Sequence, residues 1–359
     1  MARYQRQAEL FRGDVGRLAD FLVRLKPVIL GVLRGDHNSG MHFPSPLLNF
    51  SPSGVLTPEH LGLILLEGPD TASFLQGQLT QDVMLLPDGQ ARLAAYCSAK
   101  GRMLASFVVF KVSASQILLI VHKDIIESSL KRLSMFVMRA KVKLSNASLQ
   151  YDISGLLGHA LTQHAPGLNS LNPWQVLTQE DRHFIMLHAA KTQDTTVPRA
   201  LCLSPINTSL PWTGNSPLSQ SDWLLAEVLA GIGGIQSITS DAFVPQMLNY
   251  ESVDGVSFKK GCYPGQEVVA RSQFRGTLKR RAYVFSVQHA VSVGQEVFNK
   301  EDSEQACGTV VSAAMFSLDS GWGIVSMQTA AESLPLHLGS PEGPELKLHA
   351  LPYALLEDI

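Results

Sequence analysis

Short apolar runs separated by turn residues fill the chain from Gly54 to about Gly234. The unbroken run at 61–66 predicts a buried strand, and 68–70 predicts a turn whose Asp70 caps a following helix. Further strands are expected at 91–97, 103–111 and 116–121, and an apolar stripe at helical spacing predicts a helix over 126–137. Strands and helices alternate without a regular βαβ repeat, and the sequence shows no internal repeat.

The two ends of the chain have other patterns. After Arg281 only short strands are predicted, at 282–288, 308–313, 323–327 and 346–350, which indicates a small β-barrel. The first fifty residues contain a helical stripe over 18–25 and a polar loop with His37 and His42, which we interpret as solvated rather than metal-binding. We therefore expect a division into 1–50, 51–280 and 281–359.

Composition narrows the class of protein. Hydrophobic residues make up 45% and charged residues 17%, which is ordinary for a globular chain and excludes a disordered, collagenous or coiled-coil protein. The net charge of -2 gives no overall attraction to nucleic acid or to an anionic membrane. No segment resembles a membrane span; the apolar stretch at 21–33 is short and is interrupted by Arg24, Lys26 and Pro27.

The four cysteines are Cys97, Cys202, Cys262 and Cys307. None forms a C-x-x-C pair, so neither a disulfide framework nor a cysteine zinc site is expected, and a reducing, cytoplasmic location fits best. The stretch Gly231-Ile-Gly-Gly234 follows a predicted helix and does not make a dinucleotide loop. Phosphate-loop, zincin and α/β-hydrolase motifs are absent from the sequence, and we expect no metal site.

Cys262 lies in a segment with unusual local chemistry. Tyr263-Pro264-Gly265-Gln266 predicts a tight turn, because proline fixes φ at its second position and glycine permits positive φ at its third. A short helix is expected from Gln266 to Gln273. A cysteine before a helix and beside Lys259 and Lys260 is favoured as a reactive thiolate. A buried structural cysteine is the equal alternative at this point.

Basic residues are dense around the same segment. They are offset only by Asp254 and Glu267, and they form what we call the basic strip: Lys259, Lys260, Arg271, Arg275, Lys279, Arg280 and Arg281. The strip is either a solvated face or a site for RNA or another polyanion.

The residues around Cys262 carry a family resemblance. Lys260-Gly-Cys-Tyr-Pro-Gly-Gln-Glu267, followed by Val-Ala-Arg271 and Arg275-Gly-x-x-Lys-Arg280, resembles the hallmark of the YgfZ family of folate-binding proteins. That family is related to the aminomethyltransferase (T-protein) of the glycine cleavage system. Similar family motifs are found at 74–82, 99–102, 243–249 and 351–353, so that the resemblance covers about residues 54–359.

The resemblance implies an α+β fold: a pseudo-threefold ring of aminomethyltransferase-like folate-binding subdomains with a C-terminal β-barrel. It implies tetrahydrofolate or a one-carbon derivative as the cofactor, and a role in the maturation or repair of iron–sulfur proteins and in tRNA thiomethylation. The implied partners are iron–sulfur clients such as tRNA-thiomethylating enzymes, with transient tRNA contact and no membrane. A monomer is expected. The family implies an accessory factor rather than an enzyme with a settled reaction.

The family's cysteine corresponds to Cys262, which is the expected functional thiol. Trp223 aligns with a tryptophan close to the ligand in relatives, and we expect it to stack on folate. The other folate contacts expected from the motif are Lys260, Gly261, Tyr263, Gln266, Glu267 and Arg271.

Two departures from the relatives change the expected chemistry. Ala105 and Ser106 stand where the aminomethyltransferase has an acidic pair, which argues against carboxylate-assisted transfer at that position. Leu229 aligns with a pterin-reading glutamate, and Glu227, two residues away, is expected to point elsewhere on a helix. Leu61 aligns with another binding tryptophan. The alternatives to a folate-binding accessory factor are a true aminomethyltransferase and an RNA-binding protein that uses residues 259–281.

Overall fold

The computed structural model describes residues 50–208, 212, 218–274, 278–301 and 304–356. These residues belong to one compact unit, Leu47–Ile359. The predicted helix at 18–25 and the loop with His37 and His42 lie outside the described residues. The expected division at residues 50 and 280 stays a prediction.

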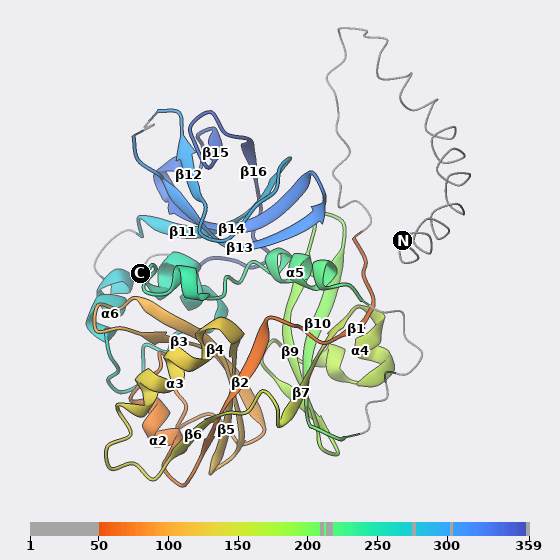
Figure 1. The fold of residues 1–359 in the computed structure, drawn as a ribbon, viewed down its shortest axis with the longest axis vertical. Helices are drawn as coiled ribbons and strands as arrows, with labels where there is room; N and C mark the ends of the chain where they lie inside the picture. Colours follow the sequence, from red (N-terminus) through yellow and green to blue (C-terminus); the bar gives the residue numbers. More distant parts are fainter. Residues whose placement is uncertain (1–49, 209–211, 213–217, 275–277, 302–303, 357–359) are drawn as a thin grey trace, which may run out of the picture. The chain divides into compact units, whose positions relative to one another are not determined.

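Two five-stranded antiparallel sheets build the larger part of the unit (Figure 1). One sheet has the order β3-β4-β5-β2-β6. Its strands are β2 (Leu61–Glu67), β3 (Gln90–Cys97), β4 (Met103–Ser113), β5 (Gln116–His122) and β6 (Lys143–Asn146). The other sheet has the order β1-β7-β10-β9-β8. Its strands are β1 (Gly54–Leu56), β7 (Tyr151–Leu157), β8 (Val176–Gln179), β9 (Arg182–Lys191) and β10 (Thr196–Pro205).

The two sheets repeat one topology. The first sheet has the order β3-β4-β5-β2, and the second sheet, taken in reverse, has the order β8-β9-β10-β7. Within each set the strands are therefore arranged in the same way relative to their order along the chain, and one further strand, β6 or β1, lies at the edge. The two sheets therefore share a topology although the sequence shows no internal repeat. Strand order is set by which apolar faces pair, so different side chains of similar polarity specify the same arrangement.

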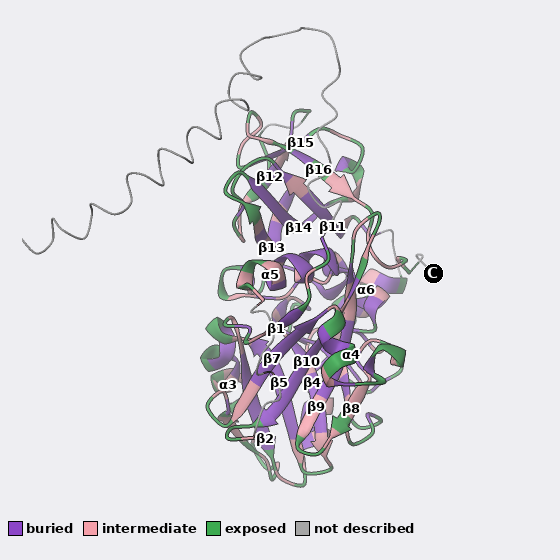
Figure 2. Cartoon of the chain, turned by 90° about the vertical axis from the view of Figure 1, so that its right-hand side faces the viewer, coloured by how far each residue is buried: buried purple, intermediate pink, exposed green. Residues whose placement is uncertain are grey.

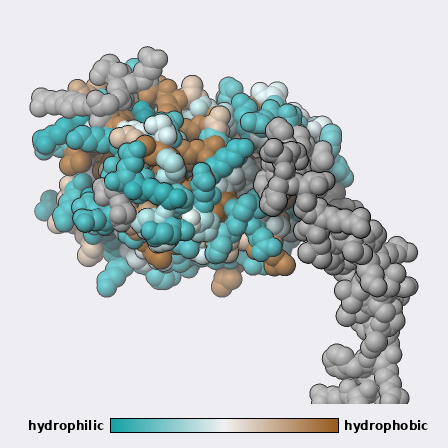
Figure 3. Space-filling view, turned by 90° about the horizontal axis from the view of Figure 1, so that it is seen from above, coloured by the Kyte–Doolittle hydropathy of each residue, from teal (hydrophilic) through white to brown (hydrophobic). Residues whose placement is uncertain are grey.

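A closed six-stranded barrel follows, with the order β11-β14-β13-β12-β15-β16. Its strands are β11 (Arg280–Val287), β12 (Glu296–Asn299), β13 (Gly308–Ser317), β14 (Ser320–Gln328), β15 (Leu336–Leu338) and β16 (Glu345–His349). The sequence pattern identified four of these and missed β12 and β15, which are too short for a clear alternation. Viewed onto the barrel end, hydrophobic side chains are scattered among hydrophilic ones (Figure 3).

Helices are few and short among the described residues. They are α2 (Thr71–Gln76), α3 (Ile126–Ser134), α4 (His159–His164), α5 (Gln220–Leu229) and α6 (Gln266–Phe274). Three 3-10 helices lie between α5 and α6: Ser237–Thr239, Pro245–Leu248 and Tyr250–Val253. Asp70 precedes α2 as expected but makes no side-chain cap; its carboxylate accepts a hydrogen bond from Lys141 N at 2.7 Å instead.

Helix α5 is apolar on most of its surface because it lies between the barrel and the sheets (Figure 1). Ser219 and Asp222 form a reciprocal capping box that fixes where it begins. The ring of Trp223 packs against Gly155 of β7, where an added Cβ would lie 2.6 Å from the ring. The strands β7 and β10 of this sheet are mostly buried (Figure 2). Of the described helices, none is long and apolar enough to cross a membrane.

Candidate functional site

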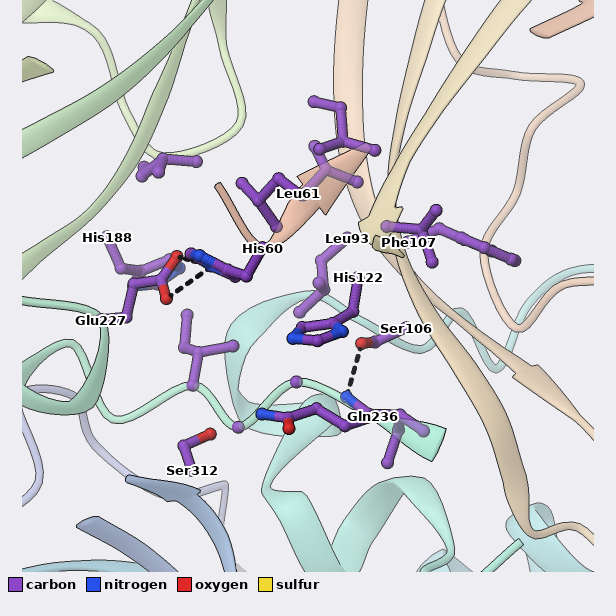
Figure 4. Close-up of a pocket in the computed structure, with 18 of the residues that line it drawn as sticks. His60, Leu61, Leu93, Ser106, Phe107, His122, His188, Glu227, Gln236 and Ser312 are labelled. Carbon is purple, nitrogen blue, oxygen red and sulfur yellow. Dashed lines mark hydrogen bonds and ion pairs between the residues drawn. The ribbon is translucent and has the colours of Figure 1, made fainter. Parts of the chain in front are cut away.

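A cavity of about 390 Å³ lies where the two sheets, α5 and the barrel meet (Figure 4). This volume is in the range of pockets that bind small organic molecules. Its walls are mainly apolar and include Leu61, Phe107, Ile120, Trp174, Leu187 and Leu224. Polar side chains converge on it from several elements: His60, Ser106, His122, His188, Arg199, Glu227, Gln236 and Ser312.

Glu227 is the carboxylate of this cavity. Leu224, Glu227 and Val228 line the cavity from one face of α5, as residues three and four apart must. The Glu227 carboxylate accepts a hydrogen bond from Trp223 Nε1 at 2.9 Å and lies 3.1 Å from His60 Nε2. Burial alone would raise the pKa of Glu227, but His60, Arg199 and Trp223 together hold it below its usual range. The carboxylate is therefore ionised at neutral pH.

Arg199 supports Glu227 from the opposite sheet. A bulge between Val197 and Arg199 shifts the β9–β10 register at this point, a device that re-aims side chains beside binding sites. The guanidinium lies 5.0 Å above the Trp223 ring and 3.7 Å from the Glu227 carboxylate. Only 5% of Arg199 is exposed, and its Nε has no hydrogen-bond partner among the described residues. Buried donors without a partner are uncommon in folded proteins.

Two histidines lie side by side where β2 begins and β5 ends. Leu61 pairs with His122 in the strand register, so His60 and His122 lie close together, with ring centroids 5.6 Å apart. Each ring has its own carboxylate: His60 has Glu227, and His122 Nδ1 lies 2.6 Å from Asp124. Such carboxylates fix the ring orientation and tautomer. Among the described residues, no group of three or more His, Cys, Asp or Glu side chains could hold a metal ion.

His188 makes the fold sensitive to acid. Burial, with a smaller contribution from Arg199, lowers the pKa of His188 to about 4. Between pH 6.5 and 4 the unfolded chain therefore binds a proton that the folded chain does not, and stability is lost as pH falls through this window. We expect His188 to cost about 2 kcal/mol of unfolding free energy between pH 7 and 5.

Urea unfolding of the wild type and of His188→Gln at both pH values measures this cost. The variant should lose about 2 kcal/mol less than the wild type, because the titrating group is gone. Other groups, such as His349, act equally in both proteins and cancel in the difference. An identical loss in both proteins would contradict the assignment.

The structure corrects the expectation for Glu227. The side chain does not point elsewhere but lines the cavity, whereas Leu229 is 3% exposed and belongs to the core. Leu61, which aligns with a binding tryptophan in relatives, does line the cavity. The sequence interpretation also missed His60, His122, His188 and Arg199.

The Cys262 segment forms the predicted turn and helix. Gln266 N donates to Tyr263 O at 3.2 Å, and Gly265 has φ +80°. A Cβ at Gly265 would lie 2.5 Å from Gly101, so the turn needs glycine for close packing as well as for its backbone angle. Cys262 is exposed, so the alternative of a buried structural cysteine is wrong.

Lys260 anchors this segment to α2. Its ammonium donates to the carbonyl of Gln76 and, at 2.6 Å, to that of Leu79, and it lies 4.8 Å from the Tyr263 ring centroid. A lysine at a helix C-terminus satisfies carbonyls that would otherwise lack donors. Burial lowers the pKa of Lys260 to about 8. Tyr263 is buried beneath it.

The described residues that line the cavity do not include the expected folate contacts. These are Trp223, Lys260, Gly261, Tyr263, Gln266, Glu267 and Arg271. Trp223 reaches the cavity only through its hydrogen bond to Glu227, since its ring is fully buried. Gly261 is exposed, and Glu267 pairs with Arg271 on the surface of α6. Their roles in binding stay predictions.

The position where the aminomethyltransferase has its acidic pair also lies at the cavity. Ser106 lines the cavity, and its Oγ accepts a hydrogen bond from Ile235 N at 2.9 Å (Figure 4). Ala105 is fully buried. Glu227 is the one carboxylate among the described residues that line the cavity, and it belongs to a different element from Ser106.

Comparison with known proteins places this geometry in a family. The GCVT N-terminal domain model matches residues 52–161. An uncharacterized protein of Haemophilus influenzae is 33% identical over 70% of this chain and 81% of its own length. The tRNA-modifying protein YgfZ of Photorhabdus laumondii is 31% identical over 86% of this chain and 94% of its own length.

The crystal structure of the glycine cleavage system aminomethyltransferase T from Bartonella henselae shares the fold. It superposes with a TM-score of 0.61, covering 85% of this chain and 87% of that one, at 16% sequence identity. The expected α+β fold, aminomethyltransferase-like with a C-terminal barrel, is thereby confirmed. With this fold, and with 31% identity over nearly all of a YgfZ protein, the chain belongs to the YgfZ family.

Proposed function

We propose that this protein binds tetrahydrofolate or a one-carbon derivative in the cavity beside Glu227. We further propose that it acts in the cytoplasm as an accessory factor for tRNA modification and iron–sulfur protein maturation. The observation that carries the first part is an ionised carboxylate at the wall of an apolar cavity of about 390 Å³. The relatives' name, tRNA-modifying protein YgfZ, supports the second part.

The residues present fit a reduced folate. The pterin ring carries an amino group and a ring N–H on one edge, and a carboxylate such as Glu227 accepts both. The side chain of Glu227 keeps 27% of its surface accessible while its position is fixed by Trp223 and His60. Arg199 also lines the cavity and adds a cation to its wall. The apolar walls suit the ring and the aminobenzoyl group.

The same cavity argues against glycine cleavage chemistry. Ala105 and Ser106 supply no ionised group, and the Ser106 hydroxyl already accepts a hydrogen bond from Ile235 N. Folate bound here would lack the carboxylate that the aminomethyltransferase places at this position. An accessory role is therefore the better reading of the site than aminomethyl transfer.

Calorimetric titration under anaerobic conditions tests the folate proposal. We expect tetrahydrofolate and its one-carbon derivatives to bind one site with a dissociation constant in the micromolar range, on the order of -8 kcal/mol. The absence of heat at high ligand concentration, with the protein shown to be folded, would contradict it.

Cys262 is proposed as the functional thiol, and its exposure makes it testable by alkylation. Cys97, Cys202 and Cys307 are buried, and burial raises the pKa of Cys97 and of Cys202 to about 12. Because the thiolate is the reactive form, iodoacetamide should modify Cys262 at least about a hundredfold faster than the others. Peptide mass spectrometry over time measures the four rates.

Unfolded protein is the control for that experiment, since all four thiols should then react at similar rates. Initial labelling of a different cysteine would contradict the exposed position of Cys262. The functional role is tested by Cys262→Ala, which should keep folate affinity but fail to restore thiomethylated tRNA in a deletion strain. Full restoration would leave Cys262 without a functional role.

A further inference from the structure

A second cationic surface lies apart from both the cavity at Glu227 and the basic strip. Between Glu127 and Asp152 the chain has five cationic residues and no acidic one: Lys131, Arg132, Arg139, Lys141 and Lys143. They belong to α3, to the segment after it and to the start of β6. We call these five cations, with Met135, Phe136 and Met138, the α3 surface.

The cations of this surface form no ion pairs within the described part of the chain. In the described part of the chain, none of the five lies within 4.0 Å of a carboxylate oxygen. Few acidic residues lie nearby, and they form no ion pair with these cations. Asp70 accepts from Lys141 N, Glu127 lies 3.4 Å from Asn146 Nδ2, and Glu67 pairs with Lys143 only in strand register. The surface keeps a net positive charge.

Large apolar side chains are exposed between these cations. Met138 is 90% exposed, Met135 61% and Phe136 42%. Cations at the end of a helix such as α3 are favoured by its dipole, which accounts for Lys131 and Arg132. It does not account for Arg139, Lys141 and Lys143, nor for the exposed methionines and phenylalanine. Cations beside an exposed aromatic ring are typical of surfaces that bind single-stranded nucleic acid segments.

A small, mainly apolar cavity adjoins this surface. It has a volume of about 280 Å³, and its lining residues come from α3, β3 and β4: Tyr96, Leu104, Ser128, Ser129, Lys131, Arg132 and Met135. Tyr96 is 1% exposed; burial raises the pKa of its hydroxyl, and a hydrogen bond with Arg132 opposes this effect. The cavity therefore holds Arg132 in place and is not itself a site for a phosphate group.

The basic strip is a weaker candidate for the same ligand. Lys260 is held by the carbonyl groups of α2, and Arg281 by the buried carboxylate of Glu251. Arg271 pairs with Glu267. Three of its cations are thus committed to contacts within the protein, whereas on the α3 surface Arg132 alone, beside Tyr96, is so committed among the described residues.

We propose that the α3 surface binds the phosphate backbone of tRNA. This inference depends on the proposed role in tRNA modification, and it names the surface that contacts the RNA. The exposed cations from Lys131 to Lys143 contact successive phosphate groups along the RNA. The Phe136 ring offers a stacking face for an unpaired base.

Two charge-matched triple variants test the proposal. Arg139→Gln/Lys141→Gln/Lys143→Gln removes three cations from the α3 surface, and Lys259→Gln/Arg271→Gln/Lys279→Gln removes three exposed cations from the basic strip. Fluorescence anisotropy with a labelled tRNA transcript, repeated across a salt series, gives affinities and salt slopes. The α3-surface variant should bind at least tenfold more weakly and lose about three from the magnitude of its salt slope. The strip variant should bind within threefold of the wild type.

Equal losses in the two triple variants, or a larger loss in the strip variant, would overturn the proposal. So would a wild type that binds vesicles of anionic phospholipid but not tRNA. Folate titration of the same variants should be unchanged, so failure here is distinguishable from failure of the folate site.

Discussion

Replacing Arg281 with alanine should lower the free energy of unfolding by about 3–5 kcal/mol. The Arg281 guanidinium lies 2.8 Å from the carboxylate of Glu251, whose side chain has no exposed surface. It also donates to Leu356 O at 3.1 Å, so this residue of β11 joins the barrel to the helical segment before α6 and to the C-terminal segment. Burial raises the pKa of Glu251 and Arg281 opposes this effect, so without Arg281 the buried carboxylate has no cation to stabilise its charged form.

Urea unfolding of Arg281→Ala measures this loss. Lys279→Ala is the control, because Lys279 is exposed and its change should stay within about 0.5 kcal/mol. The double variant Glu251→Leu/Arg281→Met should recover much of the stability, since it removes both charges and keeps the volume. A loss below 1 kcal/mol for Arg281→Ala would show that the pair does not hold the barrel in place.

Local structure was readable from the sequence where the side-chain pattern alone decides it. The strands β2 to β5, helix α3 and the turn at Gly265 follow from apolar runs, helical spacing and the φ that glycine permits. The sequence did not reveal the matching strand order of the two sheets. That order depends on pairing between distant strands, which similar polarity patterns specify without similar residues.

Glu227 was missed for a geometrical reason. Residues two apart on a helix point about 200° apart. The sequence alignment placed Leu229 at the ligand, and Glu227 was therefore expected on the opposite side of the helix. The structure has the reverse rotation, with the 224, 227 and 228 face toward the cavity. A signal was present: Glu227 is the only charged residue of α5 after Asp222. A lone acid in a buried apolar helix needs a partner, and here the partners are Trp223, His60 and Arg199.

The histidine pair carried no sequence signal of comparable strength. His60 and His122 are brought together only by the register of β2 and β5, in which Leu61 pairs with His122. Arg199 reaches the same cavity from the other sheet. It follows a β-bulge that the pattern of apolar and polar residues does not predict. The cavity is made by the meeting of the two sheets, α5 and the barrel, so its lining could not be read from any one segment.

Folate affinity in two glutamate variants tests the assignment of the cavity as the folate site. Glu227→Gln keeps the shape of the side chain but removes the charge that the pterin donors would meet. Losing a charge-assisted hydrogen bond of this kind costs about 1.5–3 kcal/mol, so tetrahydrofolate should bind about 10- to 100-fold more weakly. Glu267→Gln is the matched control, because that side chain is 86% exposed beside the Cys262 segment.

Calorimetric titration of the wild type and of both variants gives the deciding comparison, with circular dichroism to confirm that each protein is folded. The predicted result is a 10- to 100-fold loss of affinity for Glu227→Gln and wild-type affinity for Glu267→Gln. Wild-type affinity in Glu227→Gln, together with weakened binding in Glu267→Gln, would contradict the assignment and place folate at the Cys262 segment.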